Sequence, residues 1–283
     1  MLAGIIWTVD SQLIDGLNTP NLYGLLFVSG LIIGYFVIKR MFKQEGIPED
    51  FLDKLLVYVV IATIVGARLG HVFFYDWHYY KDHLSEIPMV WEGGLASHGG
   101  AIAILIALYL YSKFVSKRSM WWILDRIVAP IAIAGCFIRL GNLVNHEITG
   151  IPTDLPWGFK FMHESQEDMI LINGRYEHVY RHPAQLYESM AYLLSFGILM
   201  YMYWKTNLKE KSGFIFGWFL IFIFGWRFII EFVKIGQAER DAGMLINTGQ
   251  ILSIPFVVAG IVIVILASKK LLNPKNEIVQ NKN

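Results

Sequence analysis

Seven apolar segments recur along the chain, each close to the roughly 20 residues that an α-helix needs to cross a bilayer. Backbone exposed to lipid must make its hydrogen bonds within its own segment, so these segments are expected to be helices. With 55% hydrophobic and 17% charged residues and a mean hydropathy of +0.47, the chain has too little charge to cover a soluble protein. The segments are 20–39, 55–76, 97–115, 121–143, 184–204, 213–233 and 245–268.

The predicted fold is all-α, a polytopic membrane protein of about seven transmembrane helices in one integral membrane domain, 1–283. Of the 24 Lys and Arg residues, four lie inside helices. If the N-terminus is outside, fourteen lie in the inner loops and tail and six in the outer segments. The positive-inside rule therefore predicts an outer N-terminus and an inner C-terminus. On this orientation residues 77–96 and 144–183 face outward, the second forming a small head, and 269–283 form a flexible inner tail.

Arginines inside the apolar segments are the residues that most need an explanation. On insertion scales an arginine at the bilayer centre costs about 2.5–3.5 kcal/mol, so each is a functional candidate. Arg68, Arg139 and Arg227 lie late in segments that run outward. Further polar residues lie early in segments that run inward, and hence at a similar depth: Asn21, Tyr23, Ser97, His98, His182, Gln185, Tyr187, Glu188, Asn247 and Gln250. The pattern predicts a polar cavity open to the outer leaflet, with arginines for an anion such as a lipid phosphate.

Each of these residues also has a purely structural interpretation. Arg227 and Glu231 are four residues apart and can neutralise each other on one helix face. Arg68 can extend its side chain to the outer headgroups, and His98 can be an ordinary interfacial histidine. Asp125 and Arg126 favour an interfacial ion pair over a site.

Other function classes remain open from composition alone. An anion transporter or channel would also need buried arginines, although such transporters often have repeats and a site at the midplane. No repeat is evident here, and the polar residues lie to one side. A non-catalytic scaffold would not need His98, Arg139 and Arg227 at one depth. No set of side chains has metal-ligand spacing, and no nucleotide-binding motif occurs, so we expect no metal and no cofactor.

Residues 138–150 read Ile-Arg-Leu-Gly-Asn-Leu-Val-Asn-His-Glu-Ile-Thr-Gly. This run resembles the signature of the prolipoprotein diacylglyceryl transferase family, and the resemblance extends over nearly the whole chain. One departure is Ile138, where the family usually has a glycine before the arginine. Further motifs follow the family's order at residues 22–24, 66–71, 74–75, 93–100, 181–188, 227–232 and 249–253.

The resemblance implies an enzyme of the bacterial inner membrane, with several membrane-spanning helices and the periplasm on its outer side. Its substrates would be phosphatidylglycerol and the lipobox cysteine in the signal peptide of a preprolipoprotein. The diacylglyceryl group would move to the thiol, forming a thioether and releasing glycerol 1-phosphate. Other membrane lipid would surround the protein, and no nucleic acid would bind.

The resemblance also suggests roles for individual residues. Arg139 and Arg227 would bind the phosphate and stabilise the charge that develops on the leaving group. His98 would accept the thiol proton, since imidazole titrates near neutral pH. The remaining residues are assigned to substrate binding: Asn142, Asn145, Glu147, Gly150, Tyr23, Arg68, Gln185 and Glu231.

Overall fold

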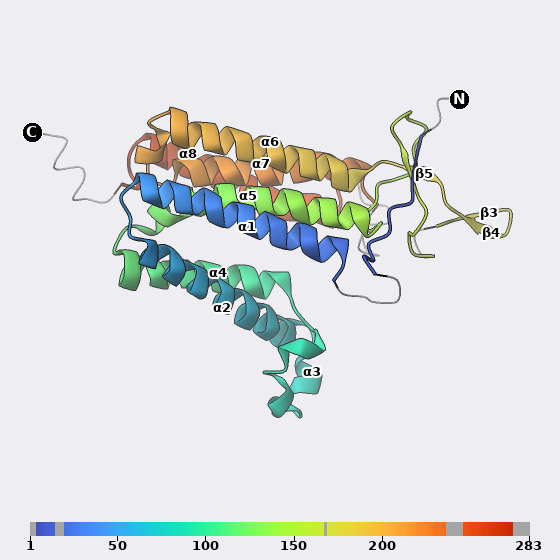
Figure 1. Ribbon diagram of the computed structural model, residues 1–283, viewed down its shortest axis with the longest axis horizontal. Helices are drawn as coiled ribbons and strands as arrows, with labels where there is room; N and C mark the ends of the chain where they lie inside the picture. Colours follow the sequence, from blue (N-terminus) through green and yellow to red (C-terminus); the bar gives the residue numbers. More distant parts are fainter. Residues whose placement is uncertain (1–3, 15–19, 167–168, 236–245, 274–283) are drawn as a thin grey trace, which may run out of the picture. The chain divides into compact units, whose positions relative to one another are not determined.

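The computed structural model describes residues 4–14, 20–166, 169–235 and 246–273. The chain divides into two compact parts, one made of 1–37 and 127–283 and the other of 38–126. Most of the described residues are helical (Figure 1). The end of the predicted tail, 274–283, lies outside the described residues.

A helix occupies each of the seven predicted segments. Six helical spans are long and apolar enough to cross a membrane, within the part of the chain that the structure describes. Helix α6 is not among them, because Gln185, Tyr187 and Glu188 interrupt its apolar sequence. The structure thus supports a polytopic membrane protein with six candidate spans. The helices are α1 Leu22–Gln44, α2 Glu49–Phe74, α4 Ser97–Tyr111, α5 Met120–Val144, α6 Ala184–Lys205, α7 Phe214–Ile230 and α8 Thr248–Ser268.

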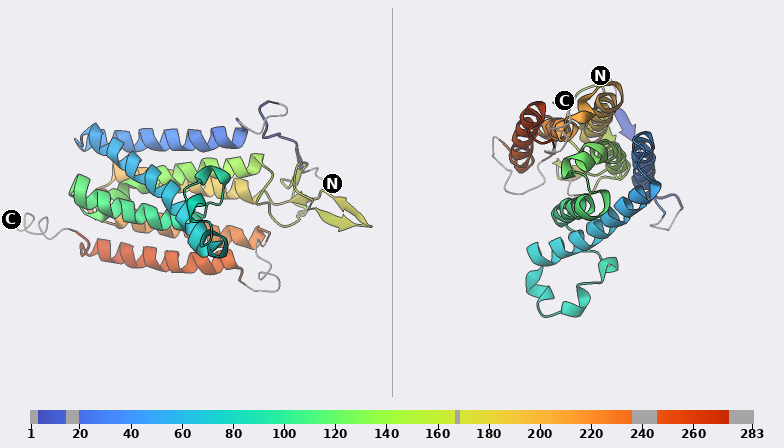
Figure 2. Two further views of the ribbon diagram at one scale, coloured as in Figure 1. Left: turned by 90° about the horizontal axis from the view of Figure 1, so that it is seen from below. Right: turned by 90° about the vertical axis from the view of Figure 1, so that its left-hand side faces the viewer.

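In the larger part, α1, α5, α6, α7 and α8 run side by side, and the strands gather at one end of this bundle (Figures 1 and 2). Glycines allow close helix contact. A Cβ atom on Gly30 of α1 would lie 2.8 Å from Phe137 Cβ of α5. A Cβ on Gly217 of α7 would lie 3.0 Å from the carbonyl oxygen of Gly260 on α8. Close backbone packing of this kind is how helices associate where lipid removes the hydrophobic drive.

Within the described residues, five short strands accompany the helices, so the protein is mostly helical rather than all-α. Strand β1 (Ile5–Trp7) pairs in parallel with β2 (Phe159–Phe161), and β2 pairs antiparallel with β5 (Tyr180–Arg181). Strands β3 (Ile170–Ile172) and β4 (Arg175–Glu177) form a separate hairpin. Strand β1 lies in the N-terminal stretch that precedes α1.

Long-range contacts explain why β1 forms a strand. The Trp7 indole stacks obliquely on Phe159, with ring centroids 5.4 Å apart. Its Nε1–H donates to the carbonyl oxygen of Leu143 at the end of α5, at 3.0 Å. Three residues have too little local pattern to specify a strand, so the partner strand determines the conformation.

In the smaller part, α2 packs on α4 through glycines. A Cβ on Gly70 of α2 would lie 2.6 Å from Gly99 Cα of α4. A Cβ on Gly66 of α2 would lie 2.7 Å from the carbonyl oxygen of the same Gly99. Residues 77–96 follow α2 as short helices, α3 (Trp77–Tyr80), η1 (Leu84–Glu86) and η2 (Val90–Glu92). A π-helical turn, η3 (Ser112–Ser116), ends α4.

Arg126 of α5 forms an ion pair with Glu45. Its Nη2 lies 2.8 Å from Glu45 Oε1, and its guanidinium lies over the Trp122 ring, 4.3 Å from the centroid. Two further short helices complete the fold, η4 (Leu208–Glu210) and η5 (Glu231–Val233), which continues α7.

Candidate active site

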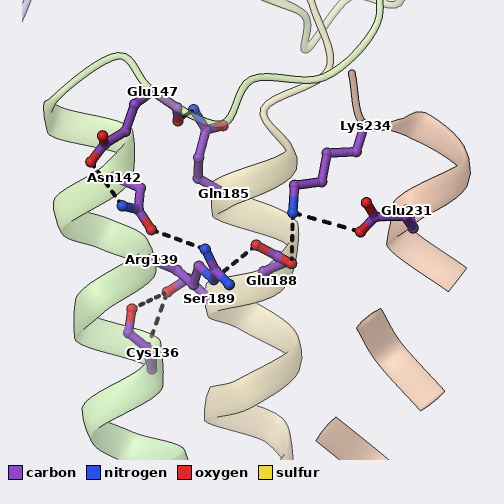
Figure 3. A network of polar contacts seen from close by, with 9 residues as sticks. All are labelled: Cys136, Arg139, Asn142, Glu147, Gln185, Glu188, Ser189, Glu231 and Lys234. Atoms are coloured by element: carbon purple, nitrogen blue, oxygen red, sulfur yellow. Dashed lines mark hydrogen bonds and ion pairs between the residues drawn. The ribbon is translucent and has the colours of Figure 1, made fainter. Parts of the chain in front are cut away.

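Arg139 is the centre of a polar network in the larger part of the chain (Figure 3). It lies near the end of α5, and the first turns of α6 face it. Its Nε lies 2.9 Å from Glu188 Oε2, and its Nη1 donates to Asn142 Oδ1 at 3.1 Å. Asn142 Nδ2 donates in turn to Glu147 Oε1 at 2.8 Å. A guanidinium has five N–H donors, so these contacts leave others for a ligand.

The charges on either side fix the orientation of the Asn142 amide. Its oxygen must face the donor Arg139, and its nitrogen must face the carboxylate of Glu147. The amide therefore links a cation to an anion that closes the turn after α5. Asn145 adds a second, longer donation to Glu147 Oε1, at 3.3 Å.

A second half of the network joins α6 to η5. Gln185 Nε2 donates to the backbone oxygen of Glu147 at 2.5 Å. Lys234 Nζ lies 3.6 Å from Glu188 Oε1 and 3.6 Å from Glu231 Oε2. Figure 3 shows Glu188 between the two cations, with Arg139 on one side and Lys234 on the other.

Because they are buried, these ion pairs matter for the stability of the fold. The side chains of Glu188 and Lys234 are 0% and 2% exposed, whereas that of Arg139 is 16% exposed. Removing one partner of a buried pair leaves an uncompensated charge and typically costs about 3–5 kcal/mol. Two carboxylates, on Glu188 and Glu231, balance the two cations, and Arg139 retains partial access.

Tyr23 and Arg227 also lie near the centre of the network. The Tyr23 ring covers Gly141, where an added Cβ would lie 2.6 Å from Tyr23 Cδ2, and Tyr23 is within electrostatic range of Glu147 and Arg139. Tyr192, buried on α6, is within range of both Arg139 and Arg227. Within the described residues, the ion pair of Glu231 is with Lys234 rather than with Arg227.

Gly150 has a packing role that is visible in the structure. A Cβ at this position would lie 2.5 Å from the Val233 oxygen and 2.6 Å from His182 Cβ. Its N–H donates to the His182 oxygen at 2.9 Å. Only glycine fits there, so Gly150 holds the turn after α5 against the start of α6 and the end of η5.

A polar cavity of about 480 Å³ opens beside the turn after α5. Asn145, His146 and Glu147 line one wall, and Asp10 and His163 line another. His146 Nε2 lies 2.8 Å from the Val9 oxygen, and its Nδ1 lies 3.3 Å from the His163 backbone N–H. Burial lowers the pKa of His146, more than its hydrogen bond to Val9 raises it.

Arg68 and His98 belong to the smaller part of the chain. The Arg68 guanidinium is buried and donates to three backbone oxygens, those of Ile87 at 2.8 Å, Gly93 at 2.6 Å and Glu86 at 2.7 Å. Arg68 therefore fastens the loop after α2 rather than extending to headgroups. His98 begins α4 and is exposed, next to the Gly99 turn that packs on α2.

Glu188 and Lys234 are central to the network but were absent from the predicted site. By sequence, Glu188 is only one of several polar residues early in its segment, and Lys234 is one of the six cations of the outer segments, yet Lys234 is 5% exposed. A usable signal existed, because Arg227, Glu231 and Lys234 follow helical spacing, as do Gln185 and Glu188.

Comparison with known proteins shows the family to which this chain is similar. The model of the prolipoprotein diacylglyceryl transferase family matches residues 16–266. The chain is 44% identical to a phosphatidylglycerol–prolipoprotein diacylglyceryl transferase of Tolumonas auensis, over 94% of this chain and 98% of the relative. It is 45% identical to one of Porphyromonas gingivalis, over 96% and 98% of the two chains. A third relative, from Chloroherpeton thalassium, is 40% identical over 94% and 95%. The chain therefore belongs to the prolipoprotein diacylglyceryl transferase family.

Proposed function

We propose that this protein transfers the diacylglyceryl group of phosphatidylglycerol to the lipobox cysteine of a prolipoprotein, the first step of lipoprotein maturation. The observation that carries the proposal is the near full-length match to relatives of that name. The buried arginine network agrees with it, because the reaction must stabilise a departing phosphate. Membership of this family favours the transferase over an anion transporter.

The reaction forms a carbon–sulfur bond and breaks a carbon–oxygen bond. The cysteine sulfur attacks the glyceryl carbon, and the electron pair of the broken bond stays on the phosphate oxygen of glycerol 1-phosphate. The thiol, whose ordinary pKa is about 8.5, must lose its proton as the sulfur attacks. Fixed cations beside the leaving oxygen stabilise this charge without reorganising, which is most effective where water is excluded.

Arg139 and Arg227 bind the phosphate in this proposal. Arg139 suits the task because Glu188 and Asn142 hold it from two sides while part of its donor set stays available. Asn142, Asn145 and Glu147 position the headgroup. Tyr23, whose ring covers Gly141 of α5, assists them. Supporting roles fall to Gly150, Arg68, Gln185 and Glu231, and His98 accepts the thiol proton.

Helix α6 is the seventh transmembrane span in this proposal. Its polar residues lower its hydropathy but face the protein, since Gln185 and Glu188 are fully buried. Its opposite face carries large apolar side chains that are more than half exposed, as expected for contact with lipid: Met190, Leu193, Leu194 and Tyr201.

The protein lies in the bacterial inner membrane with its N-terminus and residues 144–183 in the periplasm. The signal peptide of the preprolipoprotein enters from the bilayer, as phosphatidylglycerol does. Residues 77–96 also face the periplasm, and the tail after Lys269 faces the cytoplasm.

Incubation with phosphatidylglycerol radiolabelled in its acyl chains tests the function. Label should move to a lipobox peptide that contains cysteine but not to the same peptide with serine. The mass increase of one diacylglyceryl group should survive neutral hydroxylamine, which cleaves a thioester but not a thioether. Absence of transfer by folded protein would contradict the proposal, whereas movement of intact lipid or anion across the bilayer alone would favour transport.

A further inference from the structure

Three buried side chains beside Arg139 carry acceptors that make no hydrogen bond. Gln185, Glu188 and Glu231 are 0%, 0% and 5% exposed. Within the described residues, Gln185 Oε1, both carboxylate oxygens of Glu188 and Glu231 Oε2 have no hydrogen-bond partner. An unsatisfied buried polar group typically costs about 1–3 kcal/mol. Four such atoms in one network are therefore expensive.

Gln185 has no freedom to relieve this by turning its amide. Its Nε2 donates to the Glu147 backbone oxygen at 2.5 Å, which fixes Oε1 on the other side. Turning the amide over would place two oxygens against each other. Gln185 Oε1 is thus held as an acceptor that needs an external donor.

The two neighbouring cations neutralise the carboxylates without satisfying them. Lys234 Nζ is 3.6 Å from an oxygen of each carboxylate, beyond ordinary hydrogen-bond distance. Arg139 Nε lies 2.9 Å from Glu188 Oε2 in an ion pair, although Glu188 Oε2 has no hydrogen-bond partner within the described residues. The cluster has balanced charge and a shortage of donors. Its natural ligand is a neutral group that donates hydrogen bonds.

We propose that Gln185, with Glu188 and Glu231, binds the hydroxyls of the glycerol headgroup and so selects the lipid donor. This inference rests on the proposed function. A glycerol headgroup offers two neutral O–H donors a few bonds from its phosphate, and Glu188 contacts the guanidinium proposed to bind that phosphate. An ethanolamine headgroup would add a third cation beside Arg139 and Lys234. A choline headgroup has no donor.

The test compares the binding of two lipids that differ only in these hydroxyls. Native mass spectrometry of purified full-length protein measures the affinity for short-chain phosphatidylglycerol and for phosphatidylpropanol, which keeps the phosphate and lacks both hydroxyls. Wild-type protein should prefer phosphatidylglycerol by about 100-fold, because the analogue leaves the acceptors unpaired. In Gln185→Met the preference should fall about tenfold, and thermal unfolding of the variant checks that it is folded.

Two further variants test whether Gln185 accepts a hydrogen bond from the lipid or has only a structural role. Gln185→Glu, as a neutral acid, can donate to the Glu147 oxygen and still accept, so it should keep more of the preference than Gln185→Met. Ser195→Ala is the matched control, since Ser195 is a buried polar residue of α6 whose hydroxyl is already bonded to the Ala191 oxygen. It should leave the preference unchanged.

Equal binding of the two lipids by wild-type protein, or equal loss in Gln185→Met and Gln185→Glu, would overturn the inference. Binding is measured without turnover. Selective binding by a protein that transfers nothing would therefore contradict the proposed function while supporting the acceptor cluster.

Discussion

Arg139 is held on two sides by Glu188 and Asn142, so its planar geometry matters as well as its charge. A lysine has no planar fork and cannot reach a carboxylate, an amide and a phosphate at once. Removing one donor to a developing oxyanion typically costs about 2.7–4 kcal/mol. We expect Arg139→Lys to reduce kcat at least 100-fold and Arg139→Ala to abolish turnover, measured by label transfer in protein of normal monodispersity. Full activity in Arg139→Lys would mean that a point charge is sufficient.

His98 is the proposed proton acceptor, and its test is the pH dependence of the rate. His98→Gln keeps a hydrogen-bonding group but cannot take a proton. It should be nearly inactive at neutral pH and regain activity in alkali, where the thiol ionises unaided. A near-normal rate at neutral pH would leave His98 only a positioning role.

His146 makes stability depend on pH. Burial lowers its folded-state pKa below the ordinary 6.5, so the folded protein binds fewer protons than the unfolded chain in this range. Its contribution to stability is complete above about pH 6.5 and is lost as the pH falls below that value. Neighbouring Asp10, His163 and His178 act on the same ring. The unfolding temperature should drop from pH 7 to pH 5, and less so in His146→Gln.

At the scale of elements, glycines decide which helices can touch. The contact between α2 and α4 brings Gly70 and Gly99 together, and this contact sets the position of the turn that carries His98. The neighbouring Gly100 has more room, because its added Cβ would lie 3.7 Å from Ala67 Cβ, an ordinary contact.

Comparing the same substitution at two glycines separates the effect of this packing from the effect of helix propensity. Gly70→Ala and Gly100→Ala gain similar helix propensity, but only the first places a methyl group 2.6 Å from Gly99 Cα. Gly70→Ala should destabilise the protein by about 1–3 kcal/mol, whereas Gly100→Ala should be neutral or stabilising. Thermal unfolding in detergent measures both. Equal melting temperatures would show that α2 and α4 adjust without cost.

At the scale of the whole molecule, labelling at two exposed positions tests the proposed orientation in the membrane. Asn173 lies in the turn between β3 and β4, and Asn207 follows α6. The single cysteine, Cys136, is buried, so background labelling should be low. A membrane-impermeant maleimide should label Asn173→Cys in spheroplasts and Asn207→Cys only after lysis. The reverse pattern would overturn the orientation and the side on which the site opens.

The apolar segments alone determined the seven helices, because a backbone in lipid has to satisfy its hydrogen bonds locally. Motif order likewise indicated Arg139, Asn142 and Glu147, which the structure brings together. Only tertiary structure decided that Glu188 and Lys234 complete the network, because helical spacing within each segment does not show which segments meet. The same applies to β1, which has its partner strand far along the chain: contacts between distant residues depend on how helices pack, and packing is not a local property.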